Sequence, residues 1–221
     1  MELLRKNLPL YSTADTADNI GVYSYPIPSR SPAAVGEAVD HIWRFRSSTQ
    51  RPIVGLQGFG WRDLTPLSNE RRPTLQETYF MAFQAIVHGA GGIVWWGANF
   101  IESSSELWKG IKRSSWIINA VKKWLVQPDS SLAVRAPGFE ALLKNPINGR
   151  YLLIVVNPQP TWRLAQISLP MPKPYATINI MFSGRKPFTT QGSFAHWIQG
   201  YGVRLFEVSF SDLAGPTRPV S

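Results

Sequence analysis

The sequence contains no cysteine and only three histidines, His41, His88 and His196, which lie far apart along the chain. Without cysteine the chain forms no disulfides and offers no thiolate ligands, and the histidines show none of the short spacings of metal sites. We therefore predict neither a bound metal nor a cofactor. Any chemistry should come from carboxylates, amides and aromatic rings.

Long apolar runs are also missing. No stretch reaches the roughly 18 apolar residues that indicate a membrane-spanning helix. The segment MELLRKNLPLYST, residues 1–13, lacks the apolar run and small-residue cleavage site of a secretory signal. We expect a soluble protein with no membrane association, and the sequence does not identify its compartment.

Acidic residues are scarce relative to basic ones, with 14 Asp and Glu against 23 Lys and Arg, a net charge of +9. Such a balance raises nucleic acid or another anionic polymer as a partner. The basic residues are spread along the chain, however, and no block is longer than Arg71-Arg72 or Lys122-Lys123. This distribution is typical of solvated faces, so we do not predict nucleic-acid binding.

Apolar residues make up 44% of the 221 residues, which is enough for a sizeable core, and their pattern changes near Pro128. Before Pro128, strand-like runs alternate with helical patterns; after it come short β-type runs divided by Pro, Gly and Asn. We predict two domains, residues 1–128 with an α/β architecture and residues 129–221 as a small antiparallel β-sandwich.

Three strands are expected in the first domain: NIGVYSYP, PIVGLQGF and GGIVWWGAN, residues 19–26, 52–59 and 91–99. A helical pattern follows each of them. Ser31-Pro32 begins the first helix, and the capping-box patterns Thr74-x-x-Glu77 and Ser103-x-x-Glu106 begin the other two. Continuous apolar strands joined by helical crossovers indicate a parallel sheet covered by helices.

Functional groups in parallel βα folds lie at the carboxyl ends of the strands. The sequence places aromatic and amide side chains there, and we predict that they bind substrate: Tyr25, Gln57, Trp61, Trp96 and Asn99. Flat aromatic faces pack on the C–H faces of sugar rings, and amides bond the hydroxyls, so the predicted ligand is a poly- or oligosaccharide.

A core role remains open for two of these positions. Gln57 is equally compatible with a core amide whose hydrogen bonds are all made inside the protein. Of the neighbours Trp95 and Trp96, one must face the covering helices, because side chains alternate along a strand.

Carboxylates at the strand ends are few. Asp63 and Glu102 follow the second and third strands and are weak candidates for a catalytic pair. Their loops fit plain surface loops as well. Glu77 and Glu106 are interpreted as helix caps.

The segments NIGVYSYPIP, RPIVGLQGFGW and RPTLQETYFMAFQAIVHGAGGIVWW together resemble the last strands of (β/α)-barrel glycoside hydrolases. The clan concerned carries its two catalytic glutamates after the fourth and seventh strands. The tail ending in YGVRLFEV resembles the C-terminal sandwich of many of these enzymes. The resemblance covers roughly residues 15–210 and is one of pattern, since no single motif is unique to the clan. It implies a partial barrel, the last three to four βα units, followed by a β-sandwich.

The same resemblance implies that PIVGLQGF is the seventh strand and GGIVWWGAN the eighth. Gln57 then stands where the catalytic type carries its glutamate nucleophile, and an amide forms no glycosyl ester. The strand-six pattern GxDxYP reads GVYSYP here, with Tyr23 in place of the aspartate. We therefore expect this chain alone to provide a sugar subsite without hydrolysing glycosides.

Length is the largest departure from the family, because a whole barrel takes about 250 residues. The segment LPLYST, residues 8–13, is a candidate remnant of strand five. A partial barrel exposes sheet edges and apolar faces, so we expect a second copy, a missing N-terminal half-barrel, or a longer protein of which this is the C-terminal piece. We favour the longer protein. The alternative function is a non-catalytic carbohydrate-binding or assembly protein on a degenerate barrel.

Overall fold

The computed structural model describes residues 18–65 and 71–213, so the candidate strand LPLYST lies outside the described residues. The chain divides into two compact units, Met1–Ser114 and Ser115–Ser221, and the division falls inside helix α6 (Glu106–Leu125). The domain boundary after residue 128 stays a prediction.

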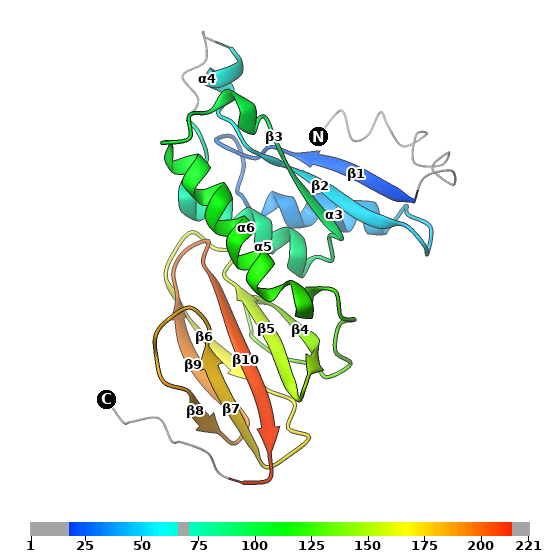
Figure 1. Cartoon of the computed structure of the whole chain (residues 1–221), viewed down its shortest axis with the longest axis vertical. Helices are drawn as coiled ribbons and strands as arrows, with labels where there is room; N and C mark the ends of the chain where they lie inside the picture. Colours follow the sequence, from blue (N-terminus) through cyan, green and yellow to red (C-terminus); the bar gives the residue numbers. More distant parts are fainter. Residues whose placement is uncertain (1–17, 66–70, 214–221) are drawn as a thin grey trace. The chain divides into compact units, whose positions relative to one another are not determined.

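The first unit is built on a parallel three-stranded sheet (Figure 1). Its strands are β1 (Asn19–Ser24), β2 (Arg51–Gln57) and β3 (Gly92–Trp96), paired in the order β1-β2-β3. Between and after them come α3 (Ala34–Trp43), α4 (Trp61–Leu64), α5 (Leu75–Val87), η2 (Ala98–Phe100) and α6. The alternation of strands and helices matches the sequence prediction, and helical crossovers make the pairing parallel.

The two faces of this sheet differ sharply. Helices α3 and α5 pack on one face, which buries Ile20, Val22, Val54 and Leu56. On the opposite face Tyr23 and Val94 are 64% and 53% exposed. In the parts of the chain that the structure describes, β1 and β3 each pair with one strand only. The sheet is therefore covered on one face and open on the other.

The open face also shows a close approach between two neighbouring strands. Tyr23 and Gly55 are register partners, and a Cβ atom at Gly55 would overlap the Tyr23 ring. The ring therefore occupies the space that a side chain at position 55 would need.

Capping explains where the long helices begin. Thr74 Oγ1 accepts a hydrogen bond from the Glu77 amide at 3.1 Å, and the Glu77 carboxylate accepts one from the Thr74 amide at 2.9 Å, so the predicted capping box is confirmed. The Ser103-x-x-Glu106 prediction is wrong. Helix α6 begins at Glu106, and Ser105 Oγ accepts the bond from the Trp108 amide at 3.2 Å. Three consecutive serines offer several cap positions, and the third is used.

The second unit holds two antiparallel sheets that share one core (Figure 1). One sheet has the order β4-β5-β10-β7-β8 and the other pairs β6 with β9. The bounds are β4 (Glu140–Ile147), β5 (Arg150–Val156), β6 (Arg163–Ser168), β7 (Tyr175–Ile180), β8 (Phe188–Thr190), β9 (Ser193–Ile198) and β10 (Val203–Ser211). This is the predicted small sandwich.

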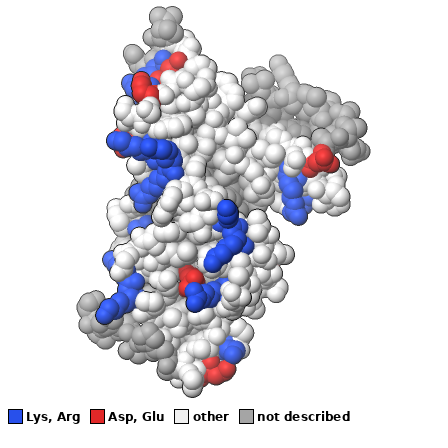
Figure 2. All heavy atoms as spheres, viewed as in Figure 1, with Lys and Arg blue, Asp and Glu red and all other residues white. Residues whose placement is uncertain are grey.

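Two general features of the described residues bear on function. Among them, no helix has both the length and the apolar character needed to cross a membrane. On the face drawn in Figure 2, Lys and Arg side chains form separate groups with acidic side chains beside some of them.

Candidate sugar-binding site at the strand ends

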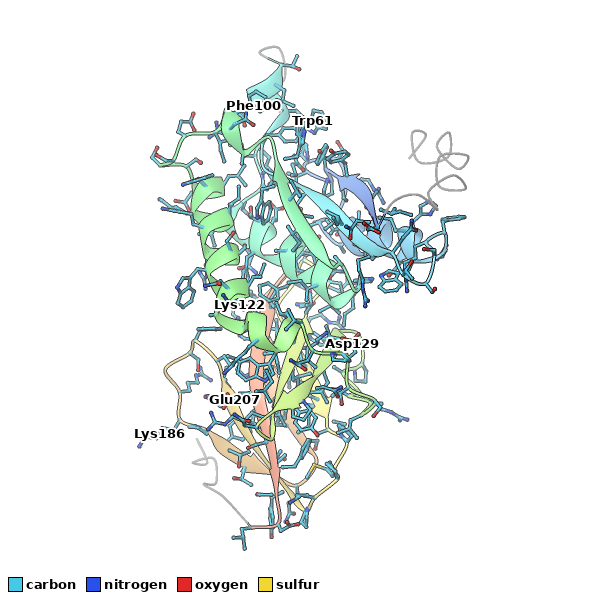
Figure 3. The ribbon with its side chains drawn as sticks, turned by 45° about the vertical axis from the view of Figure 1, so that its right-hand side comes forward. Trp61, Phe100, Lys122, Asp129, Lys186 and Glu207 are labelled. Atoms are coloured by element: carbon cyan, nitrogen blue, oxygen red, sulfur yellow. The ribbon has the colours of Figure 1, made fainter. Side chains whose placement is uncertain are left out.

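The carboxyl ends of β1, β2 and β3 carry a group of aromatic rings, which we call the strand-end cluster: Tyr25, Phe59, Trp61, Trp96 and Phe100. The Tyr25 ring centroid lies 5.1 Å from that of Phe59, 5.6 Å from that of Trp96 and 6.4 Å from that of Trp61. Figure 3 labels Trp61 and Phe100 at this end of the sheet, on α4 and η2. The structure thus brings together three predicted site residues, Tyr25, Trp61 and Trp96.

Glycines allow the segments that carry these rings to meet. The Gly58 amide donates to the Trp96 carbonyl at 2.9 Å, and a Cβ atom at Gly58 would lie 2.8 Å from that oxygen. Gly97 has a φ of 78°, and a Cβ atom there would lie 2.7 Å from the Phe59 ring. Both positions need glycine, one for the close approach and the other also for its backbone conformation.

The cluster has a buried floor and an open rim. Phe59 has no exposed surface, whereas Trp96 and Phe100 are 38% and 47% exposed. Burial, together with the neighbouring Tyr23 hydroxyl, raises the pKa of Tyr25, so its phenol is neutral across the physiological range. The rim offers flat ring faces to a ligand, and Tyr25 remains able to donate a hydrogen bond.

Gln57 lies beneath this rim with no exposed surface. Its Oε1 accepts from the Ile27 amide at 2.9 Å, and its Nε2 donates to the carbonyls of Ile27 and Phe59 at 2.9 and 3.2 Å. Both amide hydrogens are therefore used inside the protein. The geometry favours the interpretation of Gln57 as a core amide, which holds the segment after β1 against the end of β2.

The two weak catalytic candidates meet at one guanidinium. Arg72 donates to the Asp63 carboxylate through Nε and Nη2, both at 2.8 Å, and to the Glu102 carboxylate through Nη1 at 2.6 Å. The Gly60 amide also donates to Asp63, at 2.7 Å. The side chain of Asp63 is 7% exposed and that of Glu102 is 65% exposed. Asp63 is thus a buried partner of Arg72, and Glu102 is an outer one.

These contacts set the ionisation of both carboxyl groups. Burial alone would raise the pKa of Asp63, but hydrogen bonds from Arg72 and from the Gly60 amide outweigh it and lower that pKa. Hydrogen bonds from Arg72 lower the pKa of Glu102 to about 2. The two carboxylates in turn raise the pKa of Arg72. Neither carboxyl group has the raised pKa that a general acid in glycoside hydrolysis requires.

The remaining predicted residue, Asn99, is exposed on η2, between Trp96 and Phe100 of the cluster. Sequence reasoning missed Phe100 and Arg72. Phe100 comes four residues after Trp96, and this short spacing is a pattern from which its place beside Trp96 could have been predicted. Arg72 carries no such signal, because Glu102 is 30 residues away in the sequence. Within residues 18–65 and 71–213, no group of three or more His, Asp and Glu side chains is placed to hold a metal.

The chain matches no known protein-family profile and no curated protein. Solved structures do resemble it. A GH27 β-L-arabinopyranosidase from Geobacillus stearothermophilus superimposes with a TM-score of 0.60 at 11% identity, covering 92% of this chain and 48% of that one. A glycoside hydrolase family 5 protein from Bacteroides vulgatus gives 0.57 at 13%, covering 93% and 53%. Alpha-galactosidase I from Mortierella vinacea gives 0.56 at 10%, covering 93% and 56%.

These likenesses show the fold. The chain spans about half the length of the structures it matches, and those structures are (β/α)-barrel glycoside hydrolases. The fold is therefore that of a partial (β/α) barrel followed by a β-sandwich.

Proposed function

We propose that this chain is part of a glycoside hydrolase-like protein and that the strand-end cluster forms a subsite for one sugar ring. The observation that carries the proposal is the convergence of Tyr25, Trp61 and Trp96 at the carboxyl ends of three parallel strands. In barrels of this kind, ligands bind at that end. The exposed faces of Trp96 and Phe100 suit the C–H face of a sugar ring.

Polar groups at the rim suit the hydroxyls of the same ring. The Glu102 carboxylate is largely exposed, is ionised, and keeps acceptor positions beyond those used by Arg72. Asn99 lies three residues before Glu102 and offers both a donor and an acceptor. Aromatic faces combined with amide and carboxylate groups favour a carbohydrate over a phosphate, which prefers glycine-rich loops with directed cations.

We propose further that this chain by itself does not hydrolyse glycosides. Hydrolysis needs one carboxylic acid that donates a proton and a second, ionised carboxylate. Asp63 and Glu102 both have lowered pKa values and share Arg72, so this pair lacks the acid. A neutral amide, Gln57, occupies the end of β2.

A second candidate function is a non-catalytic carbohydrate-binding or assembly protein on a degenerate barrel. This candidate is favoured because Gln57 is buried and its side chain is hydrogen-bonded to the backbone. The residue at the end of β2 then stabilises the fold and takes no part in catalysis. Both candidates predict that the chain binds sugar. They differ in whether glycoside hydrolysis appears when further βα units are supplied.

Binding tests the subsite directly. We expect arabinose, galactose or their oligosaccharides to bind this chain, as measured by saturation-transfer NMR, because neighbours of the same fold are an arabinopyranosidase and a galactosidase. Trp96→Ala should weaken binding about tenfold through loss of stacking. Phe45→Ala is the matched control, since Phe45 is 40% exposed but follows α3, away from the strand ends. Unchanged affinity in both Trp96→Ala and Trp61→Ala would remove the stacking argument.

Turnover tests the second half of the proposal. We expect no hydrolysis of aryl glycosides or polysaccharides by this chain. Robust turnover that is lost in both Asp63→Asn and Glu102→Gln would overturn it and make these residues a catalytic pair.

We also propose that further βα units cover the open face of the parallel sheet, either from a second copy or from a longer protein. The exposed Tyr23 and Val94 support this, as does the coverage of about half of each neighbour. Light scattering over a range of concentrations separates the two sources. Self-association abolished by Val94→Asp indicates a second copy, and a monomer at all concentrations points to the longer protein. An in-frame stop codon just upstream of Met1 in the native gene, found together with a monomer, would refute the proposal.

A further inference from the structure

The second unit carries a groove that is separate from the strand-end cluster. Its volume is about 390 Å³, and its walls include Trp162, Leu164 and Trp197 together with Arg185 and Arg204. All of these residues belong to the unit Ser115–Ser221. Binding in this groove would therefore be independent of the site proposed above.

The apolar wall comes from the outer face of the β6–β9 sheet. Leu164 and Trp197 are register partners, so their side chains stand beside each other on one face. Trp162 lies two residues before Leu164, which places it on the same face. The exposed fractions of Trp162 and Trp197 are 60% and 58%. Ala165 and Ile167, on the other face, are buried in the core of the unit.

Exposing two tryptophan side chains to water is unfavourable, and the fold of the second unit does not require it. The core of the second unit already contains its own aromatic rings, Phe188, Phe194 and Phe206, packed edge to face. Neither tryptophan is needed to complete that core. Two exposed indoles and an exposed leucine line the same groove, where their apolar faces are accessible to a ligand.

The charged wall is of one sign. Arg204 comes from β10 and Arg185 from the segment after β7; Arg204 Nη1 also donates to the Val203 carbonyl at 3.0 Å. His196 lines the groove too, and no Asp or Glu is among its lining residues. Lys186, the next residue after Arg185, is exposed and is labelled in Figure 3. A planar guanidinium binds a carboxylate or a sulfate through two parallel hydrogen bonds. The groove thus pairs flat stacking faces with anion-binding groups.

We propose that this groove binds an acidic sugar chain, one whose rings bear carboxylate or sulfate groups. The indoles of Trp162 and Trp197 stack on the rings, and Arg185 and Arg204 bind the anionic substituents. A nucleic acid also combines planar rings with anions, but its phosphates form a continuous row that calls for a track of cations. The lining supplies two arginines, which suits charges spaced along a sugar chain.

The test uses the full chain and three sugar probes: oligogalacturonate, a sulfated galactan oligosaccharide and neutral galactan. We expect the first or second to bind in isothermal titration calorimetry at low salt, at least tenfold more tightly than neutral galactan. Trp197→Ala and Arg204→Gln should each weaken that binding about tenfold. Trp116→Phe is the control, because Trp116 is 60% exposed in the same unit and packs on Phe182, outside the groove.

The relative affinities of the probes either support the proposal or overturn it. Preference for oligogalacturonate assigns a carboxylate ligand, and preference for the sulfated probe assigns a sulfate. Neutral galactan binding that equals the acidic probes in Trp96→Ala, where the strand-end cluster is disabled, would overturn the proposal. Tighter binding of single-stranded DNA, or self-association lost in Trp197→Ala, would overturn it as well. Trp96→Ala separates the two sites: it should weaken neutral sugars at the strand ends and leave oligogalacturonate binding at the groove unchanged. Failure at one site therefore leaves the other one testable.

Discussion

Strands β3 (GIVWW) and β5 (RYLLIVV) are both apolar along most of their length, but their surroundings differ. In β5, Leu153 and Val155 lie in the core between two sheets, and Leu152 and Ile154 on the other face are equally without exposed surface. In β3, Val94 is 53% exposed. A strand apolar on both faces is expected to be covered on both. Within residues 18–65 and 71–213, β5 is thus covered on both faces, whereas the face of β3 that carries Val94 is open.

The largest effect is expected at the end of β2, where Gln57 has no exposed surface. Gln57→Glu puts a carboxyl group, without exposed surface, against the carbonyls of Ile27 and Phe59. We expect a loss of about 4 kcal/mol at pH 8, from two missing donors and an unpaired buried charge.

The pH dependence follows from the sign of the shift. Burial raises the pKa of the introduced carboxyl group in the folded state, so its ionised form is penalised there. The destabilisation relative to the original protein should be smallest near pH 4 and grow as the pH rises above about 4.3, by up to about 1.4 kcal/mol per pH unit. Urea unfolding at pH 4 and pH 8 measures it. Equal loss at both values would mean that the introduced group finds solvent or a cation.

A matched pair of valines tests the comparison of β3 and β5 itself. Val155→Ala should destabilise the second unit by about 2 kcal/mol, because Val155 is fully buried. Val94→Ala should change the stability of the first unit by less than about 0.5 kcal/mol. Amide hydrogen exchange resolves the two units separately. If Val94→Ala costs as much as Val155→Ala, the open face is covered in solution.

The effect expected at Arg72 is one on ionisation and is read by titration. In Arg72→Met, the pKa of Glu102 should rise from about 2 toward its ordinary 4.5, and that of Asp63 should rise as well. Because both pKa values are lowered in the original fold, the stability due to Arg72 is present at neutral pH and is lost as the pH falls toward 2. Carbon NMR of the side-chain carboxyls follows this titration. Lys112→Met, an exposed cation on α6, is a control that should leave both values unchanged.

Much of the fold was readable from the sequence. Apolar runs placed β1, β2 and β3, and the box of Thr74 and Glu77 placed the start of α5, because these signals are local. The convergence of Tyr25, Trp61 and Trp96 also followed, since parallel strands bring their carboxyl ends together.

Other features depend on tertiary contacts that no local pattern encodes. The role of Gln57 rests on backbone groups of Ile27, 30 residues away. The bridge from Asp63 through Arg72 to Glu102 joins helix α4 to two loops, and the sequence does not give the distances between them. The groove of Trp162 and Trp197 was also missed, because the pairing of β6 with β9 joins segments divided by two other strands.

The contact of Tyr23 with Gly55 should limit which residues occur together at these two positions in homologous sequences. Because a Cβ atom at position 55 would overlap the ring at position 23, the two positions should change together. Sequences with a side chain at 55 should carry a small residue at 23, and those that keep the aromatic ring should keep the glycine. A pair of this kind also identifies the register of β1 against β2 from sequences alone, so distant relatives become recognisable without a structure.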